Sequence, residues 1–296
     1  MEKLKFKHAP ARDKAIYIAF FIVFVIFAVI YIYPLFWAII NSLKSMEEFT
    51  NDTLSLPKQE WNFVHYIQVF TDFRTMRQDG VLLYYFDMLF NSLWILVVYV
   101  TVNVASSTLL AYALARFRFP GSNFLFAVII FANTIPIIGS GPAAFKLAIS
   151  LNLVNNPSAI WVMWASGFDM AFILLYGYFK GVSNSYSESA KIDGANNFTV
   201  LFKIILPQVV PCIAAIAITQ AIGVWNNYSI CMIYMPNYPN LAYGMYLLNG
   251  NAFLIEVDPQ PVYFAAAVIS CIPVIILYAC TQELILTNMT TGGLKG

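Results

Sequence analysis

The stretch Ile16–Ile40 reads IYIAFFIVFVIFAVIYIYPLFWAII and holds no charged side chain in 25 residues. An α-helix of about 20 apolar residues is long enough to cross the hydrocarbon core of a bilayer. The stretch is too long for the apolar part of a signal peptide, and no cleavage site of small residues follows it. It therefore predicts a retained membrane-spanning helix.

The composition of the whole chain agrees with this prediction. Of 296 residues, 60% are hydrophobic and only 10% are charged, and the mean hydropathy is +0.71. Such a chain lacks the polar surface that a soluble globule needs, so we exclude a water-soluble enzyme. The net charge of +1 gives no electrostatic basis for binding nucleic acid.

The charge-free runs predict an all-α integral membrane protein with six spans. They lie near residues 16–40, 88–115, 122–145, 158–179, 208–234 and 260–284. Cytoplasmic segments carry an excess of lysine and arginine. With both termini in the cytoplasm, eleven of the 16 basic residues lie inside, four lie outside and one lies at a span edge. The predicted connections are an outer loop at 44–87, a cytoplasmic loop at 180–207, an outer loop at 236–259 and a cytoplasmic tail at 287–296.

Several kinds of chemistry are not expected of this chain. Its two histidines, His8 and His65, lie outside the predicted spans, which argues against an intramembrane protease. No G-x-x-x-x-G-K-[ST] run is present to cradle nucleotide phosphates. The four cysteines lack the spacing of a metal site and are interpreted as small apolar residues. We therefore expect no catalytic residue, no metal and no cofactor.

The cytoplasmic loop carries the strongest local signals. Ser185 and Glu188 have the spacing of a capping box, in which the serine is the N-cap of a short helix. Gly194 stands where a helix commonly ends on a left-handed residue. A second helix, Asn196–Leu206, is predicted to run to Pro207 and Pro211, which open the next span. A short helix is marginal alone, so docking against another protein and an ordinary loop between spans both remain open.

The residues of this loop also resemble a known motif. The run from Glu188 to Ala195 reads ESAKIDGA, and the run from Ile204 to Pro207 reads IILP. Together they resemble the E-A-A-x-x-x-G-x9-I-x-L-P loop of binding-protein-dependent ABC importer permeases, with serine in place of one alanine. The resemblance implies a coupling helix that is seated in a cleft of the ATPase subunit. The residues expected to couple to the ATPase are Glu188, Ser189, Ala190, Asp193, Gly194, Leu206 and Pro207.

Two further segments resemble the same family. The turn Phe117–Gly121 reads FRFPG and is similar to the family's R-F-x-F-P-G turn, and the last seven residues read TTGGLKG. That ending resembles the T-A-G-[AG]-V-K-G tail of the smaller permease of maltose-type carbohydrate importers. In that system the tail reaches between the ATPase subunits. This implies such contacts for Gly292, Gly293 and Lys295, whereas a frayed terminus is the alternative.

The resemblance implies the type I ABC importer permease fold in a bacterial cytoplasmic membrane. The chain is then expected to be the permease subunit of an ATP-driven carbohydrate importer, with an oligosaccharide as substrate. The implied partners are a second homologous permease, two ATPase subunits that bind ATP and Mg, an extracytoplasmic solute-binding protein and the lipid bilayer. The alternatives are an importer permease for a polyol, a glycerol phosphate or a peptide, and a stand-alone secondary transporter.

Polar residues within the predicted spans are candidates for the substrate pathway. Asp169 is the only acid in the middle of a span, and an ionisable group at membrane depth faces a cavity or a partner. The other candidates are Asn133, Gln220, Trp225, Asn226 and Asn227. All of them are equally suited to hydrogen bonds between helices. The second outer loop resembles one that, in the maltose system, enters the binding protein and displaces sugar. The resemblance implies such contacts for Tyr238, Tyr243, Tyr246 and Asn249 to Asn251, and an aromatic belt at the membrane interface is the alternative.

Overall fold

The computed structural model describes residues 10–117, 119–135, 139–165, 167–250 and 259–291. The chain forms two compact units, the first from Met1–Phe73 and Asn251–Ile269, the second from Arg74–Gly250 and Ser270–Gly296. In the described part of the chain, four helices are long and apolar enough to cross a membrane. They are Arg12–Ser42, Tyr85–Arg116, Asn197–Trp225 and Pro259–Gln282.

The first unit is built from helices. It contains α1 (Ala11–Ser42), α2 (Met46–Asn51), α3 (Val64–Thr71) and the part of α14 (Pro259–Thr291) up to Ile269. Successive large apolar side chains of α1, from Ile16 to Phe36, are exposed on all sides of the helix. A helix that is apolar all round belongs in a bilayer or in a protein interior, so α1 has the surface of a membrane span.

Buried polar groups order the segment that follows α1. The Lys44 side chain is fully buried, and its Nζ donates to the carbonyl oxygen of Asp52 at 2.7 Å. His65 is buried as well, with Nδ1 2.8 Å from the carbonyl oxygen of Ser42. Lys58 donates to Asp52 Oδ2 at 2.8 Å, and this bond holds the pKa of the Asp52 carboxyl well below its usual range. The first part of the predicted outer loop is therefore an ordered substructure.

A β-hairpin opens the second unit. Strand β1 (Arg74–Met76) pairs antiparallel with β2 (Leu82–Tyr84), with Thr75 opposite Leu83. Helix α4 (Tyr85–Arg116) follows β2 without a gap. The hairpin therefore marks the start of the first long helix of this unit.

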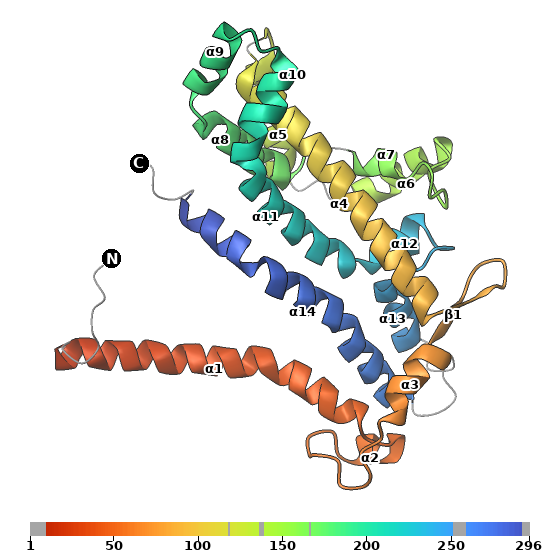
Figure 1. The fold of residues 1–296 in the computed structure, drawn as a ribbon. Helices are drawn as coiled ribbons and strands as arrows, with labels where there is room; N and C mark the ends of the chain where they lie inside the picture. The colour runs from red at the N-terminus through yellow and green to blue at the C-terminus, as the bar shows by residue number, and fades with distance from the viewer. Residues whose placement is uncertain (1–9, 118, 136–138, 166, 251–258, 292–296) are drawn as a thin grey trace. The chain divides into compact units, whose positions relative to one another are not determined.

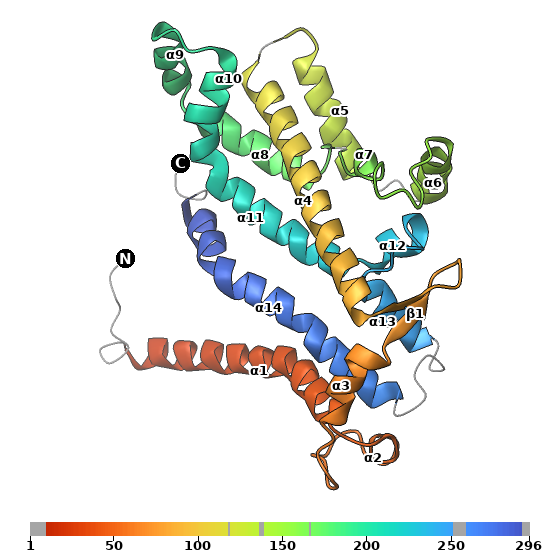
Figure 2. The same ribbon diagram turned by 45° about the vertical axis from the view of Figure 1, so that its right-hand side comes forward.

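The rest of the second unit is helical (Figure 1). In chain order come α5 (Ser122–Thr134), α6 (Ser140–Ser150), α7 (Trp161–Trp164), α8 (Met170–Gly181), α9 (Asn184–Ile192), α10 (Asn197–Thr199), the π-helical segment η2 (Val200–Ile205), α11 (Leu206–Trp225), α12 (Tyr228–Tyr234), α13 (Leu241–Gly250) and α14 from Ser270 onward. Helix α4 packs against both α8 and α11, and α4 and α11 run alongside each other (Figure 2).

Helix breaks interrupt the third, fourth and fifth predicted spans. The residues that precede α6, α8 and α12 are Gly139, Asp169 and Asn227. Gly139 has a φ of 92°, which favours glycine, and the side chains of Asp169 and Asn227 accept hydrogen bonds from backbone N–H groups of the helices they precede. Because a cap can stand inside an apolar run, hydropathy alone did not separate these helices.

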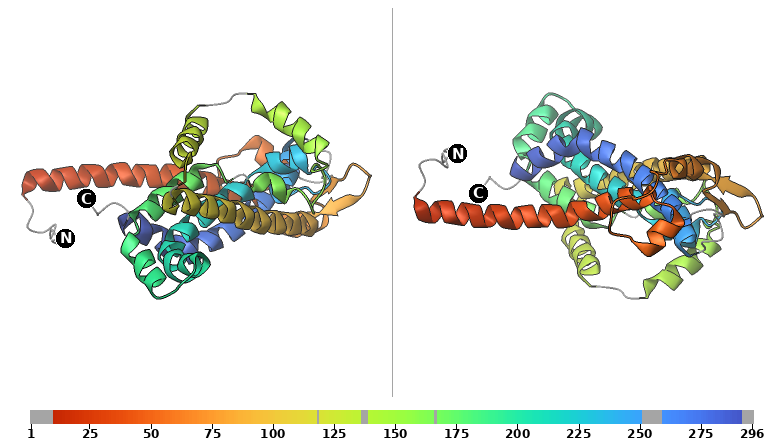
Figure 3. Two further views of the ribbon diagram at one scale, coloured as in Figure 1. Left: turned by 90° about the horizontal axis from the view of Figure 1, so that it is seen from above. Right: turned by 90° about the horizontal axis from the view of Figure 1, so that it is seen from below.

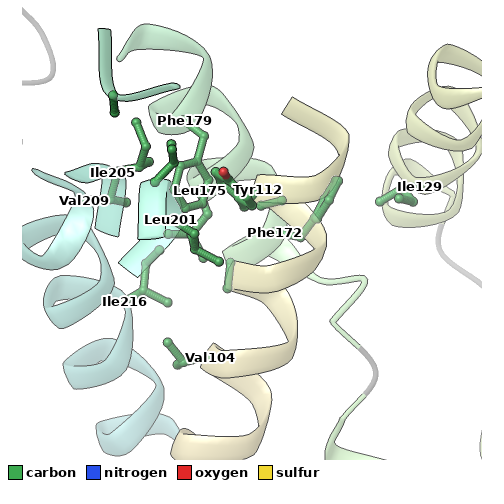
Figure 4. Close-up of a cluster of buried hydrophobic side chains, with 14 residues drawn as sticks. Val104, Tyr112, Ile129, Phe172, Leu175, Phe179, Leu201, Ile205, Val209 and Ile216 are labelled. Atoms are coloured by element: carbon green, nitrogen blue, oxygen red, sulfur yellow. The ribbon is translucent and has the colours of Figure 1, made fainter. Parts of the chain in front are cut away.

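The core of the second unit lies between α4, α8 and the start of α11. Figure 4 shows Tyr112 of α4 beside Leu175 and Phe179 of α8, with Ile205 and Val209 on the third side. All five side chains are buried. The Tyr112 and Phe179 rings meet edge to face with their centroids 5.6 Å apart, an arrangement that aromatic pairs prefer.

The second unit has two distinct ends. Viewed from above and from below, α9 lies at one end and the β-hairpin at the other (Figure 3). Helices α12 and α13 lie toward the hairpin end, where α13 packs against β1. The loop with the family-like motif is thus separated from the α12–α13 region by the length of the helix bundle.

Candidate functional site: the loop from α8 to α11

Helix α9 begins two residues earlier than the capping pattern in the sequence predicted. Its N-cap is Ser183, whose Oγ accepts from the backbone N–H of Ser185 at 3.3 Å. The predicted capping box is therefore wrong: Ser185 lies inside the first turn, and Glu188 is three residues further on with its side chain exposed. Ser183 and Ser185 both suit an N-cap, and the Ser183–Ser185 hydroxyl contact of 2.7 Å joins them.

The end of α9 has the predicted left-handed glycine. Gly194 has a φ of +84°. Its backbone N–H donates to the carbonyl of Lys191 at 3.1 Å, and that of Ala195 donates to the carbonyl of Ala190 at 2.9 Å. These two bonds form a Schellman motif, which satisfies carbonyl groups at the end of a helix. The tight turn predicted at Gly194 is confirmed.

Ala190 anchors α9 to the rest of the unit. It is 8% exposed and belongs to the same buried cluster as Val200 and Leu201 of η2. Its neighbour Ser189 is exposed, as are Glu188 and Asp193. The alanine therefore faces the bundle while the polar residues of the motif face outward.

Arg116 also holds α9 in place, a role that its sequence position did not reveal. This residue ends α4, and its guanidinium donates to the carbonyl of Val182 at 2.7 Å and to Oδ1 of Asn184. Both acceptors lie at the junction of α8 and α9. Because charge-assisted bonds are the stronger kind, the end of α4 fixes the point where α9 begins.

An exposed apolar surface accompanies the outward-facing motif residues. Ile192 is 86% exposed, Phe198 is 74% exposed and Tyr186 is 54% exposed. Large apolar side chains that are exposed beside polar ones are candidates for contact with another protein. We call these three residues, together with Glu188 and Asp193, the α9–α10 surface. The sequence motif identified Glu188 and Asp193, but it did not identify the three exposed apolar residues.

The predicted second helix continues into the next span. Asn196 caps it through Oδ1, which accepts from the backbone N–H of Thr199 at 2.8 Å. From there one helix runs from Asn197 to Trp225, so the predicted end at Pro207 is wrong. Pro207 instead stands where the π-helical segment changes to α-helix.

The π-helical turns have a physical cause in Pro207. This proline has no N–H to donate to the carbonyl of Lys203, and its ring crowds that carbonyl in an α-helix. The backbone N–H of Leu206 donates to the carbonyl of Leu201, five residues back, which is the wider π spacing. Gln208 Nε2 donates to the carbonyl of Ile204 at 2.8 Å. The wider turns accommodate the proline within a continuous helix.

Two of the predicted pathway residues contact the same face of α4. Asp169 Oδ1 accepts from Ser107 Oγ at 3.2 Å, and Gln220 Nε2 donates to Asn103 Oδ1 at 2.7 Å. Asn103 and Ser107 are four residues apart and lie on one face of the helix. Asp169 is thus the N-cap of α8 rather than a residue in mid-helix. These contacts are the hydrogen bonds between helices that the sequence left as an alternative.

The other pathway candidates lie elsewhere in the unit. Asn133 Nδ2 donates to the carbonyl of Phe168 at 3.1 Å. Trp225 Nε1 donates to the carbonyl of Ser270 at 3.2 Å, and Asn226 is exposed. Trp225 ends α11, and Asn226 and Asn227 form the break before α12. The predicted tail residues Gly292, Gly293 and Lys295 lie outside the described residues.

These features define a helical membrane protein with several spans and a capped helix–turn–helix loop at one end. A family model described as "binding-protein-dependent transport system inner membrane component" matches residues 107–290. The chain belongs to this family, and the predicted resemblance to sugar permeases of ABC importers is confirmed.

Relatives support the assignment over nearly the whole chain. The diacetylchitobiose uptake system permease protein NgcG of Streptomyces coelicolor is 28% identical, with 90% of this chain and 85% of that protein covered. The arabinooligosaccharides transport system permease protein AraQ of Halalkalibacterium halodurans is also 28% identical, with 92% and 94% covered. A chain from the crystal structure of a bacterial ABC transporter involved in alginate import has a TM-score of 0.77 at 25% identity, with 93% and 98% covered.

Proposed function

We propose that this chain is the permease subunit of an ATP-driven importer that moves an oligosaccharide across the cytoplasmic membrane. The observation that carries the proposal is the geometry of α9. The Schellman motif and Ala190 fix the helix on the bundle, while the residues of the α9–α10 surface are exposed at the end of the second unit. An ATPase subunit that seats on this surface can move the bundle through these contacts.

We propose six spans with both termini in the cytoplasm. Four long helices supply four spans, and the broken pairs α5–α6 and α7–α8 occupy the remaining predicted runs. In the second unit, Arg116, Lys180, Lys191 and Lys203 lie in or next to the α8–α11 loop, and an excess of basic residues favours the cytoplasmic side. This orientation places α9 inside the cell and the α12–α13 region outside.

We propose that force from the ATPase enters the chain at two places. The first is Ala190, which packs against η2, and η2 continues as α11 to Trp225. The second is Arg116 at the end of α4, which donates to the carbonyl of Val182 just before α9. Since α4 and α11 pack along each other, both helices move with α9. The partner ATPases hold ATP and Mg, and a second permease and an extracytoplasmic binding protein complete the assembly.

The substrate class rests on the names of the relatives. These names specify diacetylchitobiose, arabinooligosaccharides and, in a Streptococcus pneumoniae protein that is 28% identical, maltodextrin. The test is to measure which ligands the cognate binding protein takes from a panel of oligosaccharides, polyols, glycerol phosphates and peptides. Nanomolar to micromolar binding of an oligosaccharide supports the proposal, and selective binding of one of the other classes contradicts it.

Purified alone, the chain should hydrolyse no ATP, because it has no phosphate-cradling G-x-x-x-x-G-K-[ST] run. Phosphate release should begin only when the ATPase subunits are present, and it should rise when the loaded binding protein is added. A matched preparation with an ATPase subunit whose P-loop lysine is replaced controls for contaminating activity. ATP hydrolysis by the isolated chain would contradict the assignment.

Removing the last seven residues, Thr290–Gly296, should lower uptake severalfold if the tail reaches the ATPase subunits as proposed. The chain offers glycines for close backbone approach and Lys295 for a charged contact. A second variant replaces the same seven residues by a glycine–serine run of equal length. If both variants take up sugar in proteoliposomes at the wild-type rate, the tail makes no contact that transport needs, and it is a frayed terminus.

A further inference from the structure

Three tyrosine rings of α12 and α13 form an ordered aromatic surface. Tyr228 and Tyr246 stack with their centroids 4.6 Å apart and their planes at 5°, and Tyr243 lies 6.4 Å from Tyr246 at 20°. Tyr228 is 38% exposed and Tyr246 is 49% exposed, so much of each side chain stays open although the two rings cover each other. We call these three residues the tyrosine platform. The stacking of Tyr228 on Tyr246 is evident only in the structure.

A buried asparagine fixes the platform. Asn240 is 1% exposed, and its Nδ2 donates to the carbonyl of Asn227, the residue just before Tyr228, at 3.0 Å. Its Oδ1 accepts from the backbone N–H of Tyr243 at 2.8 Å. One side chain therefore bonds to both segments that carry the rings. Such a clamp holds the rings in place before any ligand arrives, which lowers the entropy cost of binding.

Two contacts with α4 hold the same region. Asn91 Nδ2 donates to the carbonyl of Pro239 at 3.0 Å, and Ser92 Oγ accepts from the backbone N–H of Leu241 at 2.8 Å. Asn91 is 8% exposed and Ser92 is 3% exposed, so both bonds are shielded from solvent. The platform is thus mounted on the longest helix of the unit.

The two helices that carry the platform contain no charged residue. No charged residue occurs between Ile204 and Ile255. Asn226 is exposed just before the start of α12, and Asn249 is exposed on α13, three residues beyond Tyr246 and on the same face. Flat aromatic faces beside amide groups suit a ligand that has both an apolar face and hydroxyl groups. A neutral pyranose or furanose ring has both.

The geometry points to a carbohydrate-stacking site at the tyrosine platform. Ring C–H groups of a neutral sugar lie against the electron-rich face of Tyr246 or Tyr228, and the neighbouring amides bond to its hydroxyls. The site rests on the proposed function, which places it at the outer end of the pathway. It receives sugar there from the binding protein, and it favours cyclic sugars over open-chain polyols.

The test compares Tyr246→Ala with Tyr246→Phe in the complete transporter, reconstituted in proteoliposomes with the binding protein on the outside. The probes are labelled maltotriose, arabinotriose and galactotriose. Loss of the ring should lower kcat/KM for uptake by about fivefold to tenfold, whereas phenylalanine, which keeps the ring, should stay within about twofold. Tyr278→Ala is the matched control, because Tyr278 of α14 is 50% exposed.

Stimulation of ATP hydrolysis by the unliganded binding protein should be equal in all four proteins, which shows that the assembly is intact. The proposal is overturned if Tyr246→Ala transports like Tyr278→Ala, or if Tyr246→Phe is as impaired as Tyr246→Ala. If the unsubstituted transporter moves none of the three sugars, the proposed function itself is contradicted. The proposed role of the platform is then contradicted as well.

Discussion

Replacing Gly194 with valine should lower sugar uptake and ATPase stimulation about tenfold or more, while the chain still inserts into the membrane. Gly194 holds a φ of +84° at the end of α9. A residue with a Cβ in the left-handed region costs about 1–2 kcal/mol, and β-branched residues cost more. No atom beyond the chain neighbours lies within 4 Å of an added Cβ, so the effect is backbone strain rather than a clash.

The measurement is uptake and ATP hydrolysis in proteoliposomes, with the amount of chain in the membrane fraction determined in parallel. Gly194→Asn is the matched control, because asparagine tolerates the left-handed conformation better than other residues. It should retain most of the coupling. Unchanged transport by the valine variant would show that the end of α9 does not transmit force, and equal damage from asparagine would show that strain is not the cause.

The sequence alone was sufficient to predict features that depend on residues close together in the chain, such as the end of α9. Gly194 was predicted because a helix end needs a left-handed residue, and the structure places one there. The start of α9 was missed because two serines, Ser183 and Ser185, compete for the N-cap and only the geometry decides between them. A capping pattern therefore located the start of the helix to within two residues.

Features that depend on tertiary packing were beyond the reach of the sequence. Ser189 and Ala190 are both small, yet only Ala190 is buried against η2. From the sequence, Arg116 could be used only as a positive charge that indicates the cytoplasmic side. The structure shows that Arg116 donates to the carbonyl of Val182, between α8 and α9. Asp169 looked like an isolated acid within an apolar run, whereas it caps α8 and meets Ser107 of α4. In each instance the partner is distant in the chain.

The π-helical segment shows how a local signal and packing combine. Pro207 was interpreted as the end of one helix and the start of another, as prolines often are. In the structure the helix is continuous from Asn197 to Trp225. The wider π-helical turns before Pro207 accommodate the proline, which has no N–H to donate. As a result Leu201 and Ile205 reach the core on the side where Ala190 packs. We therefore expect the proline to set how the loop between α8 and α11 is rotated about the axis of α11.

Replacing Pro207 with alanine should therefore disturb coupling although it removes only a ring. Alanine supplies the N–H that the carbonyl of Lys203 lacks, so the π-helical segment can become α-helix. Loss of one extra residue from a turn rotates the preceding chain by about 100° and shifts it by about 1.5 Å. Ala190 then no longer faces its site on η2. We expect uptake and ATPase stimulation to fall about tenfold, with normal membrane insertion.

Pro211→Ala is the matched control, because Pro211 lies in the same helix but beyond the π-helical segment. It also gains an N–H, yet no wide turn stands before it to be converted, so coupling should stay within about twofold of the unsubstituted chain. A cysteine pair at Ala190 and Val200 reports the geometry directly, since both are buried in one cluster. Cross-linking of this pair should fall with Pro207→Ala and not with Pro211→Ala. Equal transport and equal cross-linking in the two variants would show that Pro207 does not set the position of α9.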